Sequence, residues 1–377
     1  MIEFKNVSKS INGKSIIKDV DITIKDGEFV TVIGPSGCGK TTTLKMINKL
    51  ITPTSGTISI NGKLLKNQNT IELRRNMGYV IQQTGLFPHM TVAENIALIP
   101  NIEKMDQEKT IERVKELLDL VDMSYEDYKN KYPNELSGGQ QQRIGIARAF
   151  AMNPDIILMD EPFSALDPIT RSQLQDEIFN IQQKFKKTIV FVTHDMDEAL
   201  KLADRICIMG NGHVLQFDTP EEILRNPAND FVKDFIGEDK IWNQPQYIKA
   251  KDIMIKSPVK SSAERTILQG IQIMRSSHVD SLLLVNKENN LIGFVTLKQI
   301  RINLEKNKRL KDVMETDIIT VNLEDSIIDV LEKIDKNSIG YVPVVNDSLI
   351  LEGLITKSSL LSVMSDQYIN KEDSLDE

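Results

Sequence analysis

A glycine-rich run near the N-terminus carries the clearest chemical signal of the sequence. Residues 34–41 are Gly-Pro-Ser-Gly-Cys-Gly-Lys-Thr, which fits the phosphate-binding pattern G-x-x-x-x-G-K-[ST]. Its glycines let successive backbone N–H groups point at phosphate oxygens, its lysine can reach the β- and γ-phosphates, and its threonine hydroxyl can ligate Mg²⁺. The residues expected to hold the phosphates are Gly34, Pro35, Ser36, Gly37, Cys38, Gly39, Lys40, Thr41 and Thr42.

Two adjacent carboxylates form the second candidate group. Residues 156–159 are apolar, and Asp160 and Glu161 follow them directly. Such a run predicts a buried parallel strand that ends at the active edge of a sheet. Because Mg²⁺ keeps much of its hydration and takes few protein carboxylates, Asp160, Thr41, Gln82 and the phosphates would suffice to hold it, and Glu161 would act as the general base toward water. Two surface acids at a strand end are the alternative, which the phosphate-binding pattern disfavours.

These groups need strands and helices that bring them together. A helix is predicted to start over residues 42–47, where its positive end would favour phosphate. A polar-faced helical segment is predicted over residues 92–136, and short β-rich runs with turns in residues 1–65 predict an antiparallel subdomain beside a parallel sheet. Short apolar runs predict buried strands over residues 28–33, 77–82, 156–161 and 188–193.

A run of small residues precedes another predicted helix. Residues 136–140 are Leu-Ser-Gly-Gly-Gln, and Ser137 is a candidate N-cap for a helix over residues 141–151. A helix N-terminus with small residues is a site for an anion. Because Lys40 already holds the local phosphate, this second anion site implies that the chain pairs with a second copy.

Composition limits the possible partners. The chain has 377 residues and a net charge of −8, which argues against a general nucleic-acid binder because phosphate contacts need basic surface. Two cysteines, one of them in the glycine-rich run, favour a reducing compartment. No apolar run approaches the roughly 20 residues that span a bilayer, and no leader peptide is evident, so we expect any membrane association to come through a partner.

An internal repeat follows residue 237. Lys-Asp-Ile-Met at 251–254 recurs as Lys-Asp-Val-Met at 311–314, and two further blocks recur with the same offset of 60 residues. A constant offset indicates two copies of one unit, each predicted as strand–helix–strand–strand–helix. We therefore divide the chain into residues 1–236, a linker at 237–248, copies at 249–305 and 309–365, and a polar, mostly acidic tail at 366–377.

Taken in order, these motifs resemble the ATP-binding cassette (ABC) ATPases, of which the Leu-Ser-Gly-Gly-Gln run is the distinguishing signature. The resemblance implies an α/β P-loop NTPase fold with a RecA-like core, an antiparallel β subdomain and a helical subdomain, which binds ATP and Mg²⁺. The repeat is similar to a tandem cystathionine-β-synthase (CBS) pair of α+β type. Matched motif by motif, the family implies catalytic roles for Glu161, His194 and Gln82, metal binding by Thr41, Gln82 and Asp160, and nucleotide contacts by Ser137, Gly139, Gln140 and Asp167.

The resemblance also implies a function. Residues 220–223 and 226–237 look like the importer branch of the family, and a cassette with CBS repeats looks most like the ATPases for uptake of osmoprotectants such as glycine betaine, carnitine or choline. This implies a homodimer of cassettes at the cytoplasmic face of the membrane, bound to permease subunits, with Phe87 as an apolar anchor for the permease and an extracellular substrate-binding protein as an indirect partner. The alternatives are an importer of another small solute such as amino acids, and a non-transport ATPase acting on nucleic acid or the ribosome. A further alternative makes the CBS pair the functional unit.

Two features depart from the family pattern. Ile11 occupies the position where an aromatic residue usually stacks on adenine, which predicts weaker base discrimination. In the CBS copies, Thr296 and Thr356 are followed three residues later by Gln299 and Ser359 instead of the usual ribose-binding Asp. Related importer cassettes respond to ionic strength or to cyclic di-AMP. A regulatory site is therefore expected at Tyr341, Ile355, Thr356 and Thr296, although such apolar faces are more often core than ligand pocket.

Overall fold

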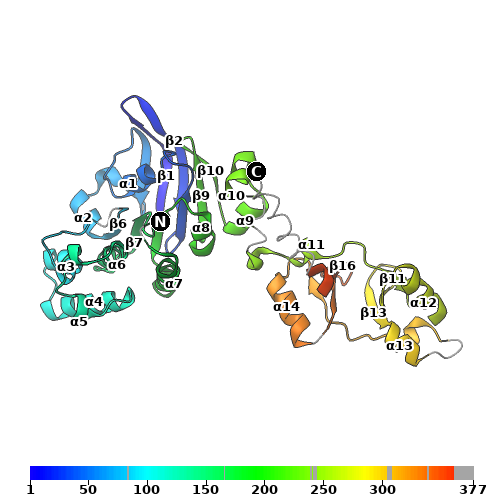
Figure 1. Ribbon diagram of the computed structural model, residues 1–377. Helices are drawn as coiled ribbons and strands as arrows, with labels where there is room; N and C mark the ends of the chain where they lie inside the picture. Colours follow the sequence, from blue (N-terminus) through cyan, green and yellow to red (C-terminus); the bar gives the residue numbers. More distant parts are fainter. Residues whose placement is uncertain are drawn as a thin grey trace, which may run out of the picture. The chain divides into compact units, whose positions relative to one another are not determined.

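A computed structural model describes residues 1–82, 85–164, 166–237, 240, 244–303, 308–337 and 339–360. The chain divides into two compact units, Met1–Gly237 and Glu238–Glu377 (Figure 1). The predicted acidic tail at 366–377 lies outside the described residues, as does much of the predicted linker (238–239 and 241–243).

A six-stranded sheet forms the centre of the first unit in the described ranges. Its strand order is β10-β9-β3-β8-β7-β6, and all neighbours are parallel except β10 and β9. Every residue of β3, β7 and β8 is buried, as expected for parallel strands covered on both faces. The strands are β3 (Phe29–Ile33), β6 (Met77–Val80), β7 (Ile156–Asp160), β8 (Thr188–Val192), β9 (Arg205–Gly210) and β10 (His213–Asp218).

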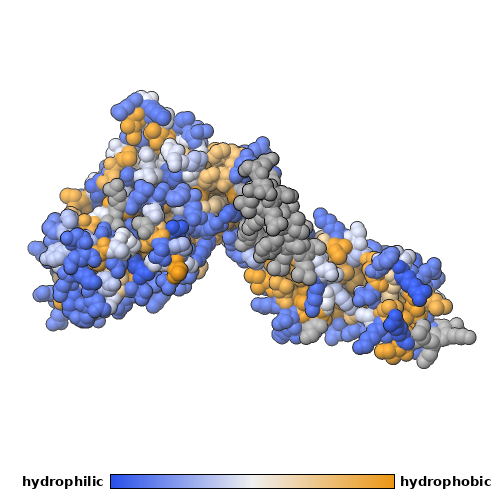
Figure 2. Space-filling model, in the orientation of Figure 1, coloured by the Kyte–Doolittle hydropathy of each residue, from blue (hydrophilic) through white to orange (hydrophobic). Residues whose placement is uncertain are grey.

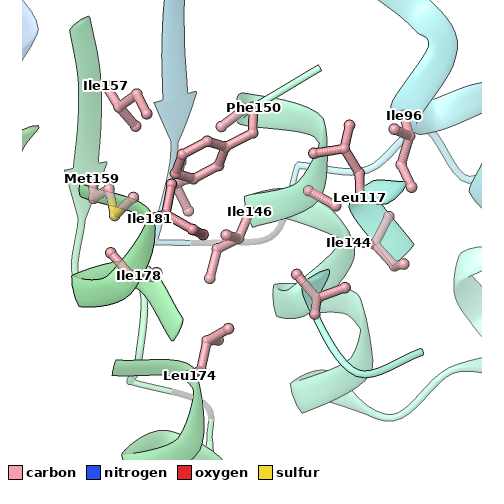
Figure 3. Close-up of a cluster of buried hydrophobic side chains, with 14 of the residues drawn as sticks. Ile96, Leu117, Ile144, Ile146, Phe150, Ile157, Met159, Leu174, Ile178 and Ile181 are labelled. Carbon is pink, nitrogen blue, oxygen red and sulfur yellow. The ribbon is translucent and has the colours of Figure 1, made fainter. Parts of the chain in front are cut away.

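Alternate residues of β7 enter two different cores. Ile157 and Met159 belong to the cluster shown in Figure 3, where they meet side chains of α6 and α7, whereas Ile156 and Leu158 belong to the cluster on the other face. This alternation is the period of two expected for a strand. The helices that flank the sheet or follow its strands are α1 (Lys40–Ile47), α6 (Gly138–Ala149), α7 (Pro168–Phe185), α8 (Met196–Leu202), α9 (Pro220–Arg225) and α10 (Asp230–Ile236).

An antiparallel subdomain packs beside this sheet, as predicted. Its strand order is β2-β1-β4-β5. The first hairpin turns at Asn12 and Gly13, both with positive φ, which is the backbone geometry that Asn-Gly favours in tight hairpins. The strands are β1 (Ile2–Ile11), β2 (Lys14–Ile24), β4 (Ser55–Ile60) and β5 (Lys63–Leu64), followed by the 3₁₀ turn η1 (Leu65–Asn67) and helix α2 (Thr70–Arg75).

The helical subdomain differs from the prediction of one segment over residues 92–136. It consists of α3 (Val92–Ile102), α4 (Gln107–Leu120), α5 (Tyr125–Tyr128) and the 3₁₀ turn η2 (Pro133–Glu135). The breaks coincide with Lys104 and Asp122, which have positive φ and cannot continue a right-handed helix. The surface over α4 and α5 is largely hydrophilic in Figure 2, in keeping with a helix that buries only one face. The strand predicted over 77–82 is also shorter and ends at Val80.

The second unit consists of two matching copies of one α+β repeat, with the predicted 60-residue offset. The sheets are ordered β11-β12-β13 and β14-β15-β16, and the pair Ser281–Thr296 in one has its counterpart in Tyr341–Thr356 of the other. The 3₁₀ turn η3 (Pro245–Tyr247) precedes the first copy, whose elements are α11 (Ala250–Ile253), β11 (Lys260–Ser262), α12 (Ile267–Ser276), β12 (Ser281–Val285), β13 (Leu291–Thr296) and α13 (Leu297–Ile302). Those of the second are η4 (Leu310–Asp312), β14 (Val321–Asn322), α14 (Ile327–Lys336), β15 (Tyr341–Val345) and β16 (Leu351–Thr356).

The first segment of each copy packs in the core of the other copy. Ala250 and Ile253 join the cluster built on α14, β15 and β16, and so does Ile248, the last residue of the predicted linker. Leu310 joins the cluster built on α12, β12 and β13. The exchange makes the two copies one folding unit, because neither core is complete without the other copy.

Candidate functional site

The glycine-rich loop joins the end of β3 to the start of α1. At Gly34, φ is 153°, and a Cβ atom would lie 2.1 Å from the carbonyl oxygen of Met209. Gly39 has a φ of 110° and is the N-cap of α1. Only glycine fits both positions, so the backbone curls between them and the first N–H groups of α1 face the loop.

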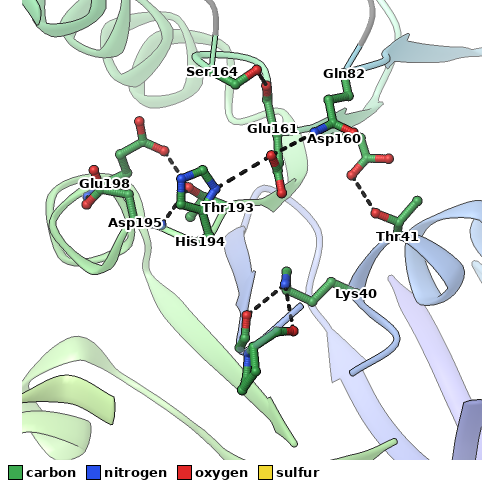
Figure 4. A network of polar contacts seen from close by, with 12 residues as sticks. Lys40, Thr41, Gln82, Asp160, Glu161, Ser164, Thr193, His194, Asp195 and Glu198 are labelled. Carbon is green, nitrogen blue, oxygen red and sulfur yellow. Dashed lines mark hydrogen bonds and ion pairs between the residues drawn. The ribbon is translucent and has the colours of Figure 1, made fainter. Parts of the chain in front are cut away.

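Lys40 lies across this loop. Its side chain is buried, and its Nζ donates to the carbonyl oxygens of Gly34 at 2.7 Å and Pro35 at 3.1 Å (Figure 4). A buried ammonium held by neutral carbonyls places a positive charge beside the N-terminus of α1, which is itself electropositive. The loop is therefore built to receive an anion.

Asp160 and Thr41 meet at the carboxyl end of β7. The Thr41 hydroxyl donates to Asp160 Oδ1 at 2.9 Å, and Asp160 is 4% exposed. Burial raises the pKa of Asp160, although the hydrogen bond from Thr41 and the charge of Lys45 oppose that shift. Burial disfavours the charged form of a carboxyl group, and a cation beside it stabilises that form.

Glu161, Gln82 and His194 converge at the ends of three neighbouring strands. Gln82 Nε2 donates to Glu161 Oε2 at 2.9 Å, and His194 Nδ1 lies 3.5 Å from the same oxygen. The backbone of Glu161 has a φ of 48°, which is uncommon outside glycine and costs about 1–3 kcal/mol. That turn directs the Glu161 side chain away from Asp160, so the two adjacent carboxylates meet different partners.

Asp195, Thr193 and Glu198 hold the turn that carries His194. The Thr193 hydroxyl donates to the buried Glu198 at 2.6 Å and accepts from the N–H of Asp195 at 3.0 Å. Glu198 belongs to none of the motifs identified in the sequence. The signal available there was an acidic residue in the first turn of a helix that follows the candidate histidine.

The small-residue run lies at the start of α6. Ser137 is the N-cap, as predicted, and its hydroxyl accepts from the N–H of Gln140 while its own N–H donates to the Gln140 side chain. Gln140 Nε2 also contacts the Tyr128 hydroxyl at 3.2 Å. Within the described ranges, no hydrogen bond or ion pair joins Ser137, Gly139 or Gln140 to the glycine-rich loop.

Comparison with known proteins places this geometry in a family. The sequence matches the family model of ABC transporters over residues 17–164 and that of the CBS domain over residues 250–306 and 310–366. It is 51% identical to the glycine betaine/carnitine/choline transport ATP-binding protein of Bacillus subtilis, covering 99% of both chains. The chain belongs to the ABC transporter ATP-binding subunits. It is therefore an ATPase that binds ATP together with Mg²⁺, and the resemblance found in the sequence is confirmed.

Other relatives agree with this ABC assignment. The carnitine transport ATP-binding protein of Listeria monocytogenes is 49% identical, covering 97% of this chain and 92% of its own. The choline transport ATP-binding protein of Bacillus subtilis is 49% identical, covering 100% and 99%. The solved dimer of the ATP-binding cassette MJ0796 bound to ADP and Pi is 37% identical with a TM-score of 0.55, covering 58% of this chain and 99% of that chain. The predicted cassette fold is thus confirmed.

Other predicted residues of the cassette lie outside the polar cluster of Figure 4. Asp167 is the N-cap of α7 and accepts from the N–H of Thr170 at 3.0 Å, which lowers the pKa of Asp167. Ile11 is exposed at the end of β1. Phe87 is also exposed, and its backbone is held on both sides by the fully buried Asn95, through Phe87 N–H to Oδ1 at 2.8 Å and Nδ2 to the Phe87 carbonyl at 3.1 Å.

The CBS pair contains a cleft of about 1180 Å³ lined by both copies. Tyr341 and Thr356 line it, whereas Ile355 is fully buried in the core beneath. Thr296 and Thr356 cap the starts of the following helical segments, where Gln299 and Ser359 complete the caps. The positions where the family usually has a ribose-binding Asp are thus engaged in local capping. Cationic side chains of the cleft are Arg275, Arg301 and Lys357.

In the part of the chain that the structure describes, helices fall short of the length and apolar character that crossing a bilayer requires.

Proposed function

We propose that this chain energises an importer of quaternary-ammonium osmoprotectants such as glycine betaine, carnitine or choline. The observation that carries the proposal is its identity of 49–51%, over nearly full length, to three transport ATP-binding proteins named for these solutes. The solute does not contact this chain. The solute class is therefore inferred from these relatives, which share the architecture of cassette and CBS pair, and not from a binding pocket for the solute.

Lys40 and the glycine-rich loop would bind the phosphates of ATP. The Lys40 ammonium would exchange its bonds to the Gly34 and Pro35 carbonyls for bonds to β- and γ-phosphate oxygens, which are stronger because both partners are charged. Loop N–H groups and the N-terminus of α1 would add neutral donors. This binding costs little reorganisation, since the loop is already curled.

Thr41, Asp160 and Gln82 would hold Mg²⁺. All three offer oxygen atoms, the donor type that Mg²⁺ prefers, and the buried Asp160 carboxylate lacks full solvation in its charged form. The Gln82 amide nitrogen faces Glu161, which leaves its oxygen as the metal donor. When bound, Mg²⁺ neutralises part of the phosphate charge.

Glu161 would act as the general base toward the attacking water. Its carboxylate is held by Gln82 and faces His194, so it is oriented without being tied to the metal residue Asp160. Transfer of a water proton to Glu161 would accompany attack on the γ-phosphate, and His194 would contact that phosphate and keep Glu161 in place. Positioned acid–base groups of this kind contribute typically about 10²–10⁴-fold.

Ser137, Gly139 and Gln140 would act on the nucleotide of a second copy. Support comes from their position at the N-terminus of α6, from the lack of polar contacts to their own loop in the described ranges, and from the dimeric relative of known structure. Asp167, at the N-cap of α7, would lie at the same dimer interface. ATP would close two such cassettes, and hydrolysis would let them separate.

Phe87 would anchor a cytoplasmic helix of the permease. Its aromatic ring is exposed and its backbone is fixed by hydrogen bonds to Asn95. Because the backbone is already ordered, binding a partner would cost little conformational entropy there. The permease would hold this subunit at the cytoplasmic face of the membrane, and a substrate-binding protein on the other side would deliver the solute.

The CBS cleft would take cyclic di-AMP as a regulator. Support comes from three cationic side chains, a volume of about 1180 Å³ and Tyr341, whose ring meets Phe294 edge-on and offers a face for a base. Titration calorimetry of the full-length chain should show binding that Tyr341→Ala weakens and Tyr341→Phe retains. A lack of heat at tens of micromolar ligand would remove this part of the proposal.

Uptake measurements test the transport assignment. Cells lacking the gene would receive either the chain or its Lys40→Ala variant, and uptake of labelled glycine betaine, carnitine, choline and histidine would be compared at high osmolarity. We expect the unaltered chain, but not the Lys40→Ala variant, to restore uptake of a quaternary ammonium compound. Restoration of histidine uptake only would contradict the proposed solute class, while equal uptake with Lys40→Ala would contradict the energising role.

A further inference from the structure

The turn that carries His194 is braced by a buried carboxylate to which the proposed mechanism gives no role. Glu198, in the first turn of α8, is 7% exposed and accepts the Thr193 hydroxyl at 2.6 Å on Oε2. Gln175 Nε2 of α7 lies 3.5 Å from its Oε1. Burial raises the pKa of Glu198, and the hydrogen bond from Thr193 opposes this rise. A buried carboxylate is costly unless its hydrogen bonds are made, so its partners are held firmly.

Thr193 connects this carboxylate to both sides of the histidine. Its hydroxyl donates to Glu198 and accepts from the N–H of Asp195, while its backbone N–H donates to the carbonyl of Val32 in β3. Asp195 in turn caps α8 through the N–H groups of residues 197 and 198. The residues before and after His194 are thereby fixed to one another, to the sheet and to α8.

The imidazole of His194, in contrast to the backbone turn that carries it, is largely exposed. The side chain is 69% exposed, and its Nδ1 lies 3.5 Å from Glu161 Oε2. Its direction therefore depends on the backbone turn between Thr193 and Asp195. Figure 4 shows Glu198 on the opposite side of His194 from Glu161.

We propose that Glu198, acting through the Thr193 hydroxyl, is the positioning residue that aims His194 at Glu161. The inference rests on the proposed role of His194. It adds that α7, whose N-cap is Asp167, is linked to the same turn by Gln175 and Glu198, and also by Arg171, which lies 4.0 Å from Asp195. A displacement of α7 would therefore move the turn that carries His194 through these contacts, without requiring a change in the bound nucleotide.

Kinetics of the full-length chain test the positioning role. Thr193→Val removes the hydroxyl with little change in volume, and Glu198→Ala removes its acceptor. We expect either change to lower kcat for ATP about ten- to a hundredfold, since a misplacement near 1 Å has effects of that order, while KM for ATP changes by less than about twofold. Thr193→Ser keeps a hydroxyl and should restore most of kcat.

A matched control lies at the other end of the same strand. The buried Thr188 hydroxyl accepts from the N–H of Gly27 at 3.0 Å, so Thr188→Val removes one hydrogen bond at the start of β8, whereas Thr193→Val removes two just after its end. Thr188→Val should lower the melting temperature, by less than Thr193→Val does, and leave kcat unchanged. Equal losses of kcat in both variants would show a general effect of destabilisation and overturn the inference.

Spectroscopy separates this inference from the role of His194. The chain has four histidines, so ¹⁵N-histidine labelling can follow His194 against the other three. Thr193→Val should shift the His194 imidazole resonances alone. If His194→Ala leaves turnover intact, the proposed role of His194 fails. If His194→Ala abolishes turnover but Thr193→Val changes neither kcat nor the His194 resonances, only the positioning inference fails.

Discussion

The two units of this chain use their segments in opposite ways. The cassette brings single residues from different segments to one sheet edge. Lys40 follows β3, Asp160 and Glu161 lie at the end of β7, and His194 follows β8. Asp160 and Glu161 are adjacent but contact different side chains. The CBS pair brings two copies of one segment together, with pairings repeated at an offset of 60 residues. The first arrangement produces chemistry, and the second produces a nearly symmetric frame around a cleft.

Within the CBS pair, symmetry holds for buried positions and fails at the surface. Strand pairings repeat residue for residue, yet residues 249–305 contain nine basic and five acidic side chains, while residues 309–365 contain five basic and ten acidic ones. In the cleft, Tyr341 corresponds to Ser281. Packing conserves the frame because a buried change costs stability, whereas surface positions diverged without that cost.

The largest effect should come from Glu161→Gln. Loss of the base should lower ATP turnover about 10²–10⁴-fold while leaving ATP binding intact, because the glycine-rich loop is unchanged. Steady-state hydrolysis and nucleotide binding measure the two properties, and sedimentation with ATP should show more dimer. Glu112→Gln, an exposed change on α4, is the control and should hydrolyse normally. Turnover near the normal rate would contradict the assignment of Glu161.

The next largest effect is expected for Gly34→Ala, which should lower both the stability of the cassette and its affinity for ATP. A Cβ atom there would lie 2.1 Å from the Met209 carbonyl oxygen, and overpacking costs about 1–3 kcal/mol in addition to the strain of positive φ. Gly37→Ala, where a Cβ would meet no atom within 4 Å, should suffer the φ strain alone. Thermal unfolding and ATP affinity should rank Gly34→Ala well below Gly37→Ala. Equal effects would contradict the close approach.

A pH-dependent gain in stability is expected for Asp160→Asn. Burial raises the folded-state pKa of Asp160 above its unfolded value, so the native state holds its proton more tightly. The cost of the charged form is absent below the unfolded pKa of about 3.9 and is fully present above the folded pKa. Without ATP, Asp160→Asn should therefore raise the melting temperature at pH 7 and lose this advantage near pH 4. A variant that melts lower at pH 7 would contradict the burial effect.

In the second unit, Gly353→Ala should destabilise by about 1–2 kcal/mol, as overpacking does. Its Cβ would lie 2.5 Å from Met254 Sδ and 3.0 Å from Met254 Cβ, where the exchanged segment crosses β16. Gly293→Ala, which meets Met314, should behave alike, and Met254→Ala should relieve the first change only. ATP turnover of the purified chain should not change. Relief of Gly293→Ala by Met254→Ala would contradict the exchange of segments.

The smallest effect is expected at two matching ion clusters. Glu264 pairs with Arg309 at 2.7 Å and Lys311 at 2.9 Å, and Glu324 pairs with Lys249 and Lys251 in the same way. Both carboxylates are about 60% exposed, so Glu264→Gln and Glu324→Gln should destabilise less than Gly353→Ala does. Their effect should vanish in 1 M salt, where the screening length is about 3 Å. Persistence of the effect at that salt concentration would show that packing, and not charge, is responsible.

Prediction from the sequence succeeded where the determinants are local. The glycine-rich loop, the Ser137 cap and the 60-residue repeat all depend on neighbouring residue types or on a fixed spacing. It was less accurate where tertiary contacts or positive φ decide. The segment predicted as helical over 92–136 is broken at Lys104 and Asp122, and Glu198 was missed because its role depends on a contact with Thr193.

The sequence by itself determined which groups are available: a lysine and threonine in a phosphate-binding loop, two adjacent carboxylates, and two copies of one module. Tertiary structure alone decided how they are used. The left-handed turn at Glu161 separates its carboxylate from Asp160, parallel strand ends bring Gln82 and His194 to it, and the CBS copies exchange their first segments. These outcomes depend on distances between residues far apart in the chain, which only the packed fold sets.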